Sequence, residues 1–175
     1  GEEATPRRGS NKIKIEWRTF HPNMTAETKE DGSIVFCRAL SGRWDVALGK
    51  EPVTMGRREW TVSVPPGTTY LNYIGVASEG CDMRTHPRHT SAWAVCVPSY
   101  ELHSGAEEGT KNPAWQAPWL GGARTLRVLL DMHARTLSVA RDDEEAMRLA
   151  YSNLPSSVYP YLCGGSSGLS FTVLP

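Results

Sequence analysis

Apolar residues alternate with polar or small residues in one segment of this chain after another. The clearest segments are Trp44, Val46 and Leu48; Trp60, Val62 and Val64; Trp93, Val95 and Val97; Leu126, Val128 and Leu130; and Leu169, Phe171 and Val173. A period of two is typical of a strand that buries one face. Turn-forming residues such as Asp31-Gly32, Pro65-Pro66-Gly67 and Gly121-Gly122 separate these segments. Many short alternating strands between turns predict an all-β fold, an antiparallel sandwich or barrel.

Only one segment has helical character. Residues 143–151 follow Asp142, and either Asp142 or Asp143 is placed to cap a helix, so we predict at most a short surface helix near residues 143–151. Residues 1–11 are polar and offer no apolar face, which indicates a disordered leader ahead of a single domain, 12–175. In that domain we expect one common core that contains Trp60, Val62, Val76, Trp93, Val128, Leu130, Leu137 and Phe171.

Composition indicates the compartment in which such a domain works and the partners that it does not attract. The 19 basic and 19 acidic residues balance, so no overall field would draw the protein to nucleic acid or to an anionic membrane. No apolar run is long enough to span a membrane, and the N-terminus lacks the apolar core of a signal peptide. The four cysteines are widely spaced and form no CxxC pair, which indicates reduced thiols. We therefore expect a soluble protein of the cytoplasm or the nucleus.

Three patterns could carry chemistry, and each has a simpler explanation. Gly164–Gly168 matches the G-x-S-x-G nucleophile motif, but only seven residues follow and none is a histidine, so a flexible turn is favoured. Cys81, His86 and His89 could ligate zinc, but a fourth ligand is not evident and a solvated loop is favoured. The acidic run 142–145 suits the start of a helix better than a pair of catalytic carboxylates. We expect no enzyme activity, no metal site and no cofactor.

Several motifs, taken in chain order, resemble those of the SPRY (B30.2) domain family over about residues 13–174. Arg58–Val64 resembles the aromatic-rich YWEVEV strand, and Ile74–Ala77 matches VGVA. Ser91–Val95 resembles SWGL, and Tyr100–Gly105 resembles the LYHDG strand and turn that follow it. The resemblance implies a concanavalin-like fold, a two-sheet antiparallel β-sandwich.

The second half of the chain continues the resemblance and also departs from it. Residues 129–139 match LLD…GTLSF, Ala150–Leu154 resembles AFRNL, and Val158–Tyr161 matches LYPAV. Arg135 stands where the family usually has a glycine in a tight turn, so either the turn type differs or Arg135 is strained. Residues 141–147 replace the family's NG hairpin. No separate PRY segment precedes the first strand, which favours a SPRY-only domain.

The resemblance implies a non-catalytic protein–protein interaction module that binds a peptide or a protein surface through its loops. Such modules serve as target-recognition or scaffold parts of larger proteins, for example ubiquitin-ligase adaptors. Peptide-binding members with a SOCS box use three places, which correspond here to the residue before the VGVA strand, the loop after it and the turn after LYPAV. The candidate site residues are therefore Tyr70, Arg84, His86, Arg88, His89, Gly164, Gly165, Ser166 and Ser167.

The residues around this site leave several interpretations open. Two arginines and two histidines within residues 83–89 suit an acidic or phosphorylated ligand, and a solvated basic loop explains them equally well. Trp115 and Trp119 would be either interface anchors or residues folded back onto the sandwich. A structural subunit of a large assembly and a carbohydrate-binding lectin-like sandwich are the alternative functions.

Overall fold

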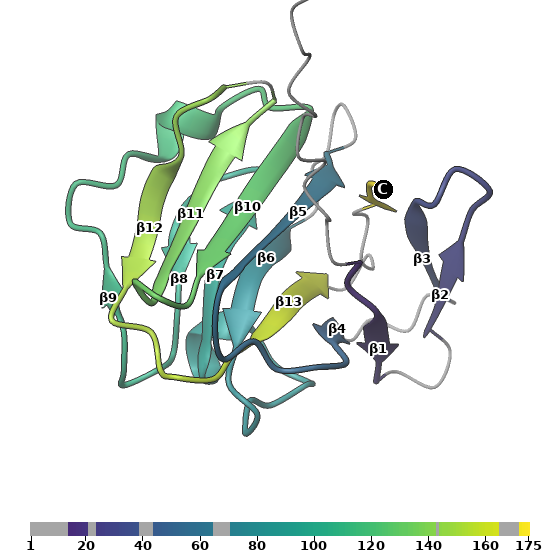
Figure 1. The fold of residues 1–175 in the computed structure, drawn as a ribbon, viewed down its shortest axis with the longest axis horizontal. Helices are drawn as coiled ribbons and strands as arrows, with labels where there is room; N and C mark the ends of the chain where they lie inside the picture. The colour runs from purple at the N-terminus through teal and green to yellow at the C-terminus, as the bar shows by residue number, and fades with distance from the viewer. Residues whose placement is uncertain (1–13, 21–23, 39–43, 65–70, 143, 165–171) are drawn as a thin grey trace, which may run out of the picture.

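The computed structural model describes residues 14–20, 24–38, 44–64, 71–142, 144–164 and 172–175, and the statements below concern these residues. Their regular secondary structure consists of short strands and two short 3₁₀ helices (Figure 1). The strands are β1 (Trp17–Thr19), β2 (Met24–Thr28), β3 (Ile34–Arg38), β4 (Asp45–Gly49), β5 (Arg57–Ser63), β6 (Asn72–Ala77), β7 (Ala92–Val97), β8 (Leu102–His103), β9 (Thr110–Lys111), β10 (Thr125–Asp131), β11 (Thr136–Arg141), β12 (Arg148–Ser152), β13 (Tyr159–Gly164) and β14 (Thr172–Val173). The helices are η1 (Pro87–His89) and η2 (Ala117–Leu120).

The strands form two antiparallel sheets that lie one over the other (Figure 1). One sheet has the order β1-β4-β13-β6-β7-β8, and we call it the six-stranded sheet. The other has the order β2-β3-β14-β5-β10-β11-β12-β9, and we call it the eight-stranded sheet. This arrangement confirms the predicted two-sheet antiparallel sandwich. No helix in the described part of the chain is long and apolar enough to cross a membrane.

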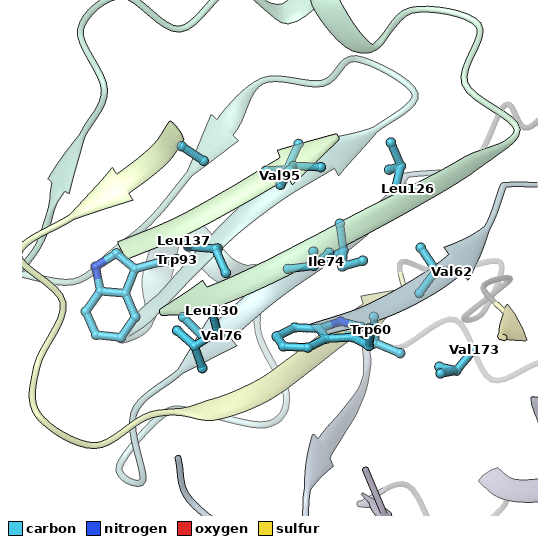
Figure 2. Close-up of a cluster of buried hydrophobic side chains, with 14 of the residues drawn as sticks. Trp60, Val62, Ile74, Val76, Trp93, Val95, Leu126, Leu130, Leu137 and Val173 are labelled. Atoms are coloured by element: carbon cyan, nitrogen blue, oxygen red, sulfur yellow. The ribbon is translucent and has the colours of Figure 1, made fainter. Parts of the chain in front are cut away.

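The main core lies between the two sheets and contains the residues that alternation predicted. β5 and β10 bury every second side chain, as strands with one wet face do. Trp60, Val62, Val76, Trp93, Val128, Leu130 and Leu137 are all buried in one cluster (Figure 2). Phe171, the eighth predicted member, lies outside the described residues.

The outer face of the six-stranded sheet is buried as well, which alternation did not predict. Every residue of β4, β6, β7 and β13 is buried. A second apolar cluster covers this face, and it consists of Val46, Leu48, Tyr73, Ala77, Cys81, Ala92, Ala94, Cys96, Tyr159, Tyr161 and Cys163. Cys81 comes from the long connection between β6 and β7, residues 78–91, which we call the β6–β7 loop. This loop therefore closes the outer face.

Two backbone positions within the motifs have geometry that favours glycine. A Cβ atom at Gly75 would collide with the carbonyl oxygen of Trp93 on the neighbouring strand β7, so the close approach of β6 and β7 requires glycine. Arg135 has a φ of 54°, in the left-handed region that favours glycine, so the turn between β10 and β11 holds the backbone of this residue in a strained conformation. The carbonyl of Arg135 accepts a hydrogen bond from the N–H of Leu154, which fixes the turn.

The predicted short helix near residues 143–151 is wrong. Residues 148–152 form strand β12, which pairs with β11 and β9. The Asp142 carboxylate instead accepts hydrogen bonds from the backbone N–H groups of Arg124 and Thr125, and these bonds hold its pKa below the usual range. Asp142 thus fixes the start of β10.

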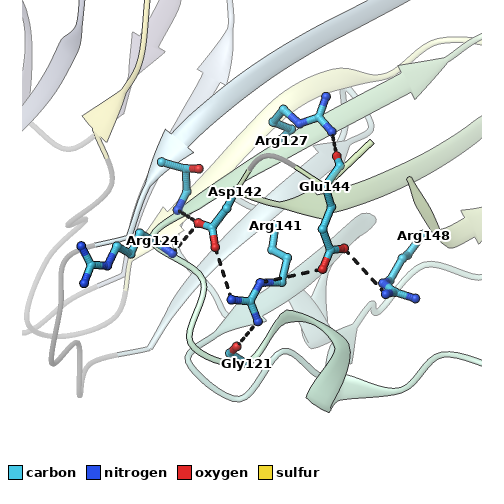
Figure 3. Close-up of polar contacts among 8 residues, drawn as sticks. Gly121, Arg124, Arg127, Arg141, Asp142, Glu144 and Arg148 are labelled. Carbon is cyan, nitrogen blue, oxygen red and sulfur yellow. Dashed lines mark hydrogen bonds and ion pairs between the residues drawn. The ribbon is translucent and has the colours of Figure 1, made fainter. Parts of the chain in front are cut away.

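The acidic run takes part in an ion-pair network on this side of the molecule. Arg141 lies between the carboxylates of Asp142 and Glu144, and Arg148 approaches Glu144 from the other side (Figure 3). The guanidinium of Arg141 also donates to the carbonyl of Gly121 over 2.6 Å. These contacts join the β11–β12 connection to the segment before β10.

Candidate functional site

The candidate site lies at one end of the six-stranded sheet. β6 begins at Asn72, which pairs with Gly164 at the end of β13 and with Val97 at the end of β7. Gly164 also pairs with Asp45 at the start of β4. Four strand ends therefore meet here. Of the predicted site residues, Gly164 is buried in β13, whereas Tyr70, Gly165, Ser166 and Ser167 lie outside the described residues.

The β6–β7 loop leaves β6 at the opposite end of the sheet and folds back along the outer face. Its 3₁₀ helix η1 is held by Gly105, whose N–H donates to the carbonyls of Pro87 over 2.9 Å and of Thr90 over 3.1 Å. A Cβ atom at Gly105 would lie 2.5 Å from the carbonyl oxygen of Arg88, so the contact needs glycine. These bonds hold η1 against the segment that follows β8.

His86 attaches the loop to Tyr73 of β6. Its Nδ1 atom accepts a hydrogen bond from the backbone N–H of Arg88 over 3.0 Å, so the proton of the neutral ring lies on Nε2. Nε2 lies 2.6 Å from the hydroxyl oxygen of Tyr73 and donates to it. Burial, aided by His103 and Arg88, lowers the pKa of His86 to about 4. His86 is thus buried, and both of its ring nitrogens are bonded within the protein.

An aromatic cluster surrounds His86, and three of its members, Trp44, Tyr73 and His103, were not among the predicted site residues. The ring centroids of Trp44 and His103 lie 5.1 and 5.2 Å from that of His86, and the centroid of Tyr73 lies 4.6 Å away. Trp44 and His103 are half-buried. The signal that could have found Trp44 is its alternation with the apolar residues of β4.

The exposed residues of the loop are Glu79, Gly80, Asp82, Arg84, Arg88 and His89. Neither Arg84 nor Arg88 forms an ion pair with a described residue. The contact of Arg84 with Asp82 is made by its backbone N–H, and Nε of Arg88 donates to Nε2 of His89. The remaining N–H groups of both guanidinium ions face solvent. Of the described residues predicted for the site, Arg84, Arg88 and His89 are presented at the surface.

The thiols of Cys81 and Cys163 near the loop are buried. Burial raises the pKa of Cys81 to about 11 and that of Cys163 to about 12, so both are protonated at neutral pH. The Cys81 thiol donates to the sulfur of Met83 over 3.6 Å. In the described part of the chain no group of three or more His, Cys, Asp or Glu residues could hold a metal ion.

Trp115 and Trp119, in the connection between β9 and β10, fold back onto the sandwich. The indole N–H of Trp115 donates to the carbonyl of Tyr100 over 2.8 Å, and its ring packs against the main core. Trp119 meets Trp115 edge-on at 5.7 Å, and the guanidinium of Arg148 lies 4.8 Å from the centre of its ring. Their contacts are internal, so they are poorer candidates for a binding surface than the β6–β7 loop.

Comparison with solved structures shows the fold. The chain is similar to the SPRY domain of human HERC1, with a TM-score of 0.59 and 20% sequence identity over 90% of this chain and 96% of that chain. It is also similar to stonustoxin, with a TM-score of 0.54 and 16% identity over 87% of this chain and 26% of that chain. No family model and no curated protein sequence match. These likenesses confirm the SPRY fold expected from the motifs, and at such identities they show the fold alone.

Proposed function

We propose that this chain is a non-catalytic protein–protein interaction module that binds a peptide or a protein surface at the tip of its β6–β7 loop. The observation that carries the proposal is the hydrogen bond between His86 and Tyr73. It fixes the loop against the sheet, so that Arg84 and Arg88 are displayed from a rigid base. A binding group that is held in place loses less conformational entropy when the partner binds.

The partner that suits this surface is acidic or phosphorylated. Arg84 and Arg88 have no described carboxylate within ion-pair distance, and guanidinium groups bind carboxylates and phosphates through two parallel hydrogen bonds. His89 adds a polar ring beside Arg88. This part of the surface therefore offers several unused donors, whereas overall charge does not select a partner because the chain is neutral.

The wider role that we propose is that of a target-recognition or scaffold part of a larger protein in the cytoplasm or the nucleus. A ubiquitin-ligase adaptor is the form of this role that the resemblance to SPRY domains favours.

The test is to screen an array of acidic and phosphorylated peptides against matched neutral peptides and to titrate the best binder. The double substitution Arg84→Ala with Arg88→Ala should weaken binding by about 2 to 5 kcal/mol if both charges are buried in the complex, and by less if they lie on its rim. The control is Arg57→Ala with Arg58→Ala, which removes the same charge from β5 of the eight-stranded sheet. Equal affinities of the two double variants at low and at high salt would reject the loop as the binding surface.

A further inference from the structure

Strand β1 is at one end of the six-stranded sheet, where it pairs with β4 on one side only (Figure 1). The carbonyl of Glu16, just before β1, accepts a hydrogen bond from the N–H of Lys50 over 2.8 Å, so the even-numbered residues here direct their backbone groups toward β4. The N–H and C=O groups of Trp17 and Thr19 therefore point the other way, and no strand in the described part of the chain pairs with them. β1 thus offers an unpaired backbone edge.

A cation held between two aromatic rings lies on the outer face of this edge. Arg18 alternates with Trp17, which is buried in the main core, so its side chain lies on the outer face of the sheet. Its guanidinium carbon is 5.5 Å from the centre of the Phe20 ring and 5.6 Å from that of the Tyr159 ring. Arg18 is exposed, and its side chain forms no ion pair or hydrogen bond with a described residue. The two rings restrict the side chain, while its N–H donors stay unused.

Phe20 supplies exposed apolar surface beside this cation. The residue is 38% exposed and lies two positions after Arg18, so both side chains would face the same side of a strand added beside β1. Both also stand at positions whose backbone groups point to β4, where directly opposite residues of an added strand approach most closely, at a Cα separation of about 4.5 Å. A carboxylate there matches the guanidinium of Arg18 through two parallel hydrogen bonds, and an apolar side chain matches Phe20.

We propose that β1 binds an extended segment of a partner protein as an added antiparallel strand, and that this segment carries an acidic residue opposite Arg18 and an apolar residue opposite Phe20. Backbone hydrogen bonds to Trp17 and Thr19 supply affinity, and the two side-chain pairs supply specificity. In an antiparallel segment the apolar residue precedes the acidic one by two positions. This edge uses none of the exposed residues of the β6–β7 loop, so it does not depend on the proposed function.

The experiment is a titration of the ¹⁵N-labelled protein with the peptide acetyl-Lys-Thr-Phe-Thr-Glu-Thr-Lys-amide, followed through the backbone amide signals. The signals of Trp17 and Thr19 should move downfield and saturate, with a dissociation constant of about 0.1 to 10 mM. The isomer acetyl-Lys-Thr-Phe-Glu-Thr-Thr-Lys-amide, which places its Phe and Glu on opposite faces of a strand, should bind more weakly. N-methylation of the first peptide at the Thr between Phe and Glu should also weaken binding, because it removes the donor to the carbonyl of Thr19.

Substitutions separate this edge from the β6–β7 loop. Arg18→Gln should weaken the binding measured at Trp17 and Thr19 by about 2- to 5-fold, as the loss of one exposed charge pair does. The control, Arg84→Gln with Arg88→Gln, should leave that affinity unchanged, whether or not the loop binds a partner of its own. Absence of a saturable shift at Trp17 and Thr19 up to about 10 mM peptide, equal binding of the N-methylated peptide, or equal affinity of Arg18→Gln and the control would overturn the proposal.

Discussion

The ring of His86 donates a hydrogen bond to the hydroxyl of Tyr73 over 2.6 Å and connects a surface loop to a buried strand. Tyr73 belongs to the second apolar cluster, and His86 belongs to the β6–β7 loop that covers that cluster. The bond therefore has two consequences. It stabilises the cover of the six-stranded sheet, and it sets the position from which Arg84 and Arg88 extend.

We predict that Tyr73→Phe destabilises the protein by about 1 to 3 kcal/mol, because it leaves the buried N–H of His86 without its acceptor. Tyr161→Phe is the matched control, since the hydroxyl of Tyr161 is buried and its neighbour is the Cys163 thiol, a weaker partner than an imidazole. Removal of this hydroxyl should cost less than Tyr73→Phe. Urea denaturation of both variants measures the difference, and equal losses would mean that the His86–Tyr73 bond contributes little.

Stability should fall between neutral and mildly acidic pH because of His86. The pKa of its folded form is lowered to about 4 from 6.5, so the unfolded chain binds more protons between these values. The stability that neutral His86 contributes, up to about 3 kcal/mol, is present above pH 6.5 and is lost as the pH falls toward 4.

Denaturation curves of the wild type and of His86→Gln at pH 7 and pH 5 test this expectation. The variant should lose less stability than the wild type when the pH is lowered. The pKa of His103 is lowered in the same direction by burial, so His103→Gln is the second variant to measure. A pH dependence identical in the wild type and His86→Gln would contradict the assignment to His86.

Trp60→Ala should destabilise the protein by about 3 to 5 kcal/mol, as the loss of a buried aromatic residue does. Trp60 is 5% exposed and lies in the main core. Trp119→Ala removes a half-buried ring from the surface and should cost less than about 2 kcal/mol. Thermal or chemical unfolding distinguishes the two, and a cost at Trp60 no larger than at Trp119 would show that Trp60 is not part of the core.

Gly75→Ala should cost about 3 kcal/mol or more, because the new methyl group collides with the backbone of β7 and neither strand can move freely. Gly80→Ala is the control, because no atom outside the adjacent residues lies within 4 Å of a Cβ placed there. It should change stability by less than about 0.5 kcal/mol. Similar melting temperatures for the two variants would mean that β6 and β7 separate at little cost.

The sequence predicted strands best where one face of the sheet is exposed to solvent. Trp60 and Val62 in β5, and Val128 and Leu130 in β10, follow the period of two because their neighbours are partly or fully exposed. In β6 the period does not show which residues face the main core, because the β6–β7 loop buries Tyr73 on the opposite face. Burial of this face by a loop depends on contacts between residues far apart in the chain, which local alternation does not show.

The predicted helix failed for a related reason. Asp142 is a good helix cap in isolation, but in the fold its carboxylate bonds to Arg124 and Thr125, 18 and 17 residues earlier in the chain. The strand that follows pairs with β11 through Leu149 and Tyr151. Tertiary hydrogen bonds outweighed local helix preference.

At the candidate site the sequence did not show which side chains of the loop are buried and which are exposed. Arg84 and Arg88 were recognised as a basic pair from their spacing, and they are exposed. His86 was grouped with them because it is a histidine in a polar stretch, whereas it is buried and neutral. The partners that bury it, Tyr73 and Trp44, come from other strands.

Because its buried and its exposed side chains stand at different positions, the β6–β7 loop can be changed at the exposed positions alone. The side chains that face the sheet, Cys81, His86, Pro87 and Thr90, are buried, whereas those at Asp82, Arg84, Arg88 and His89 are exposed. The outward positions can be randomised in a library while the inward ones are kept, so the domain could serve as a display scaffold whose specificity is changed without rebuilding the sandwich.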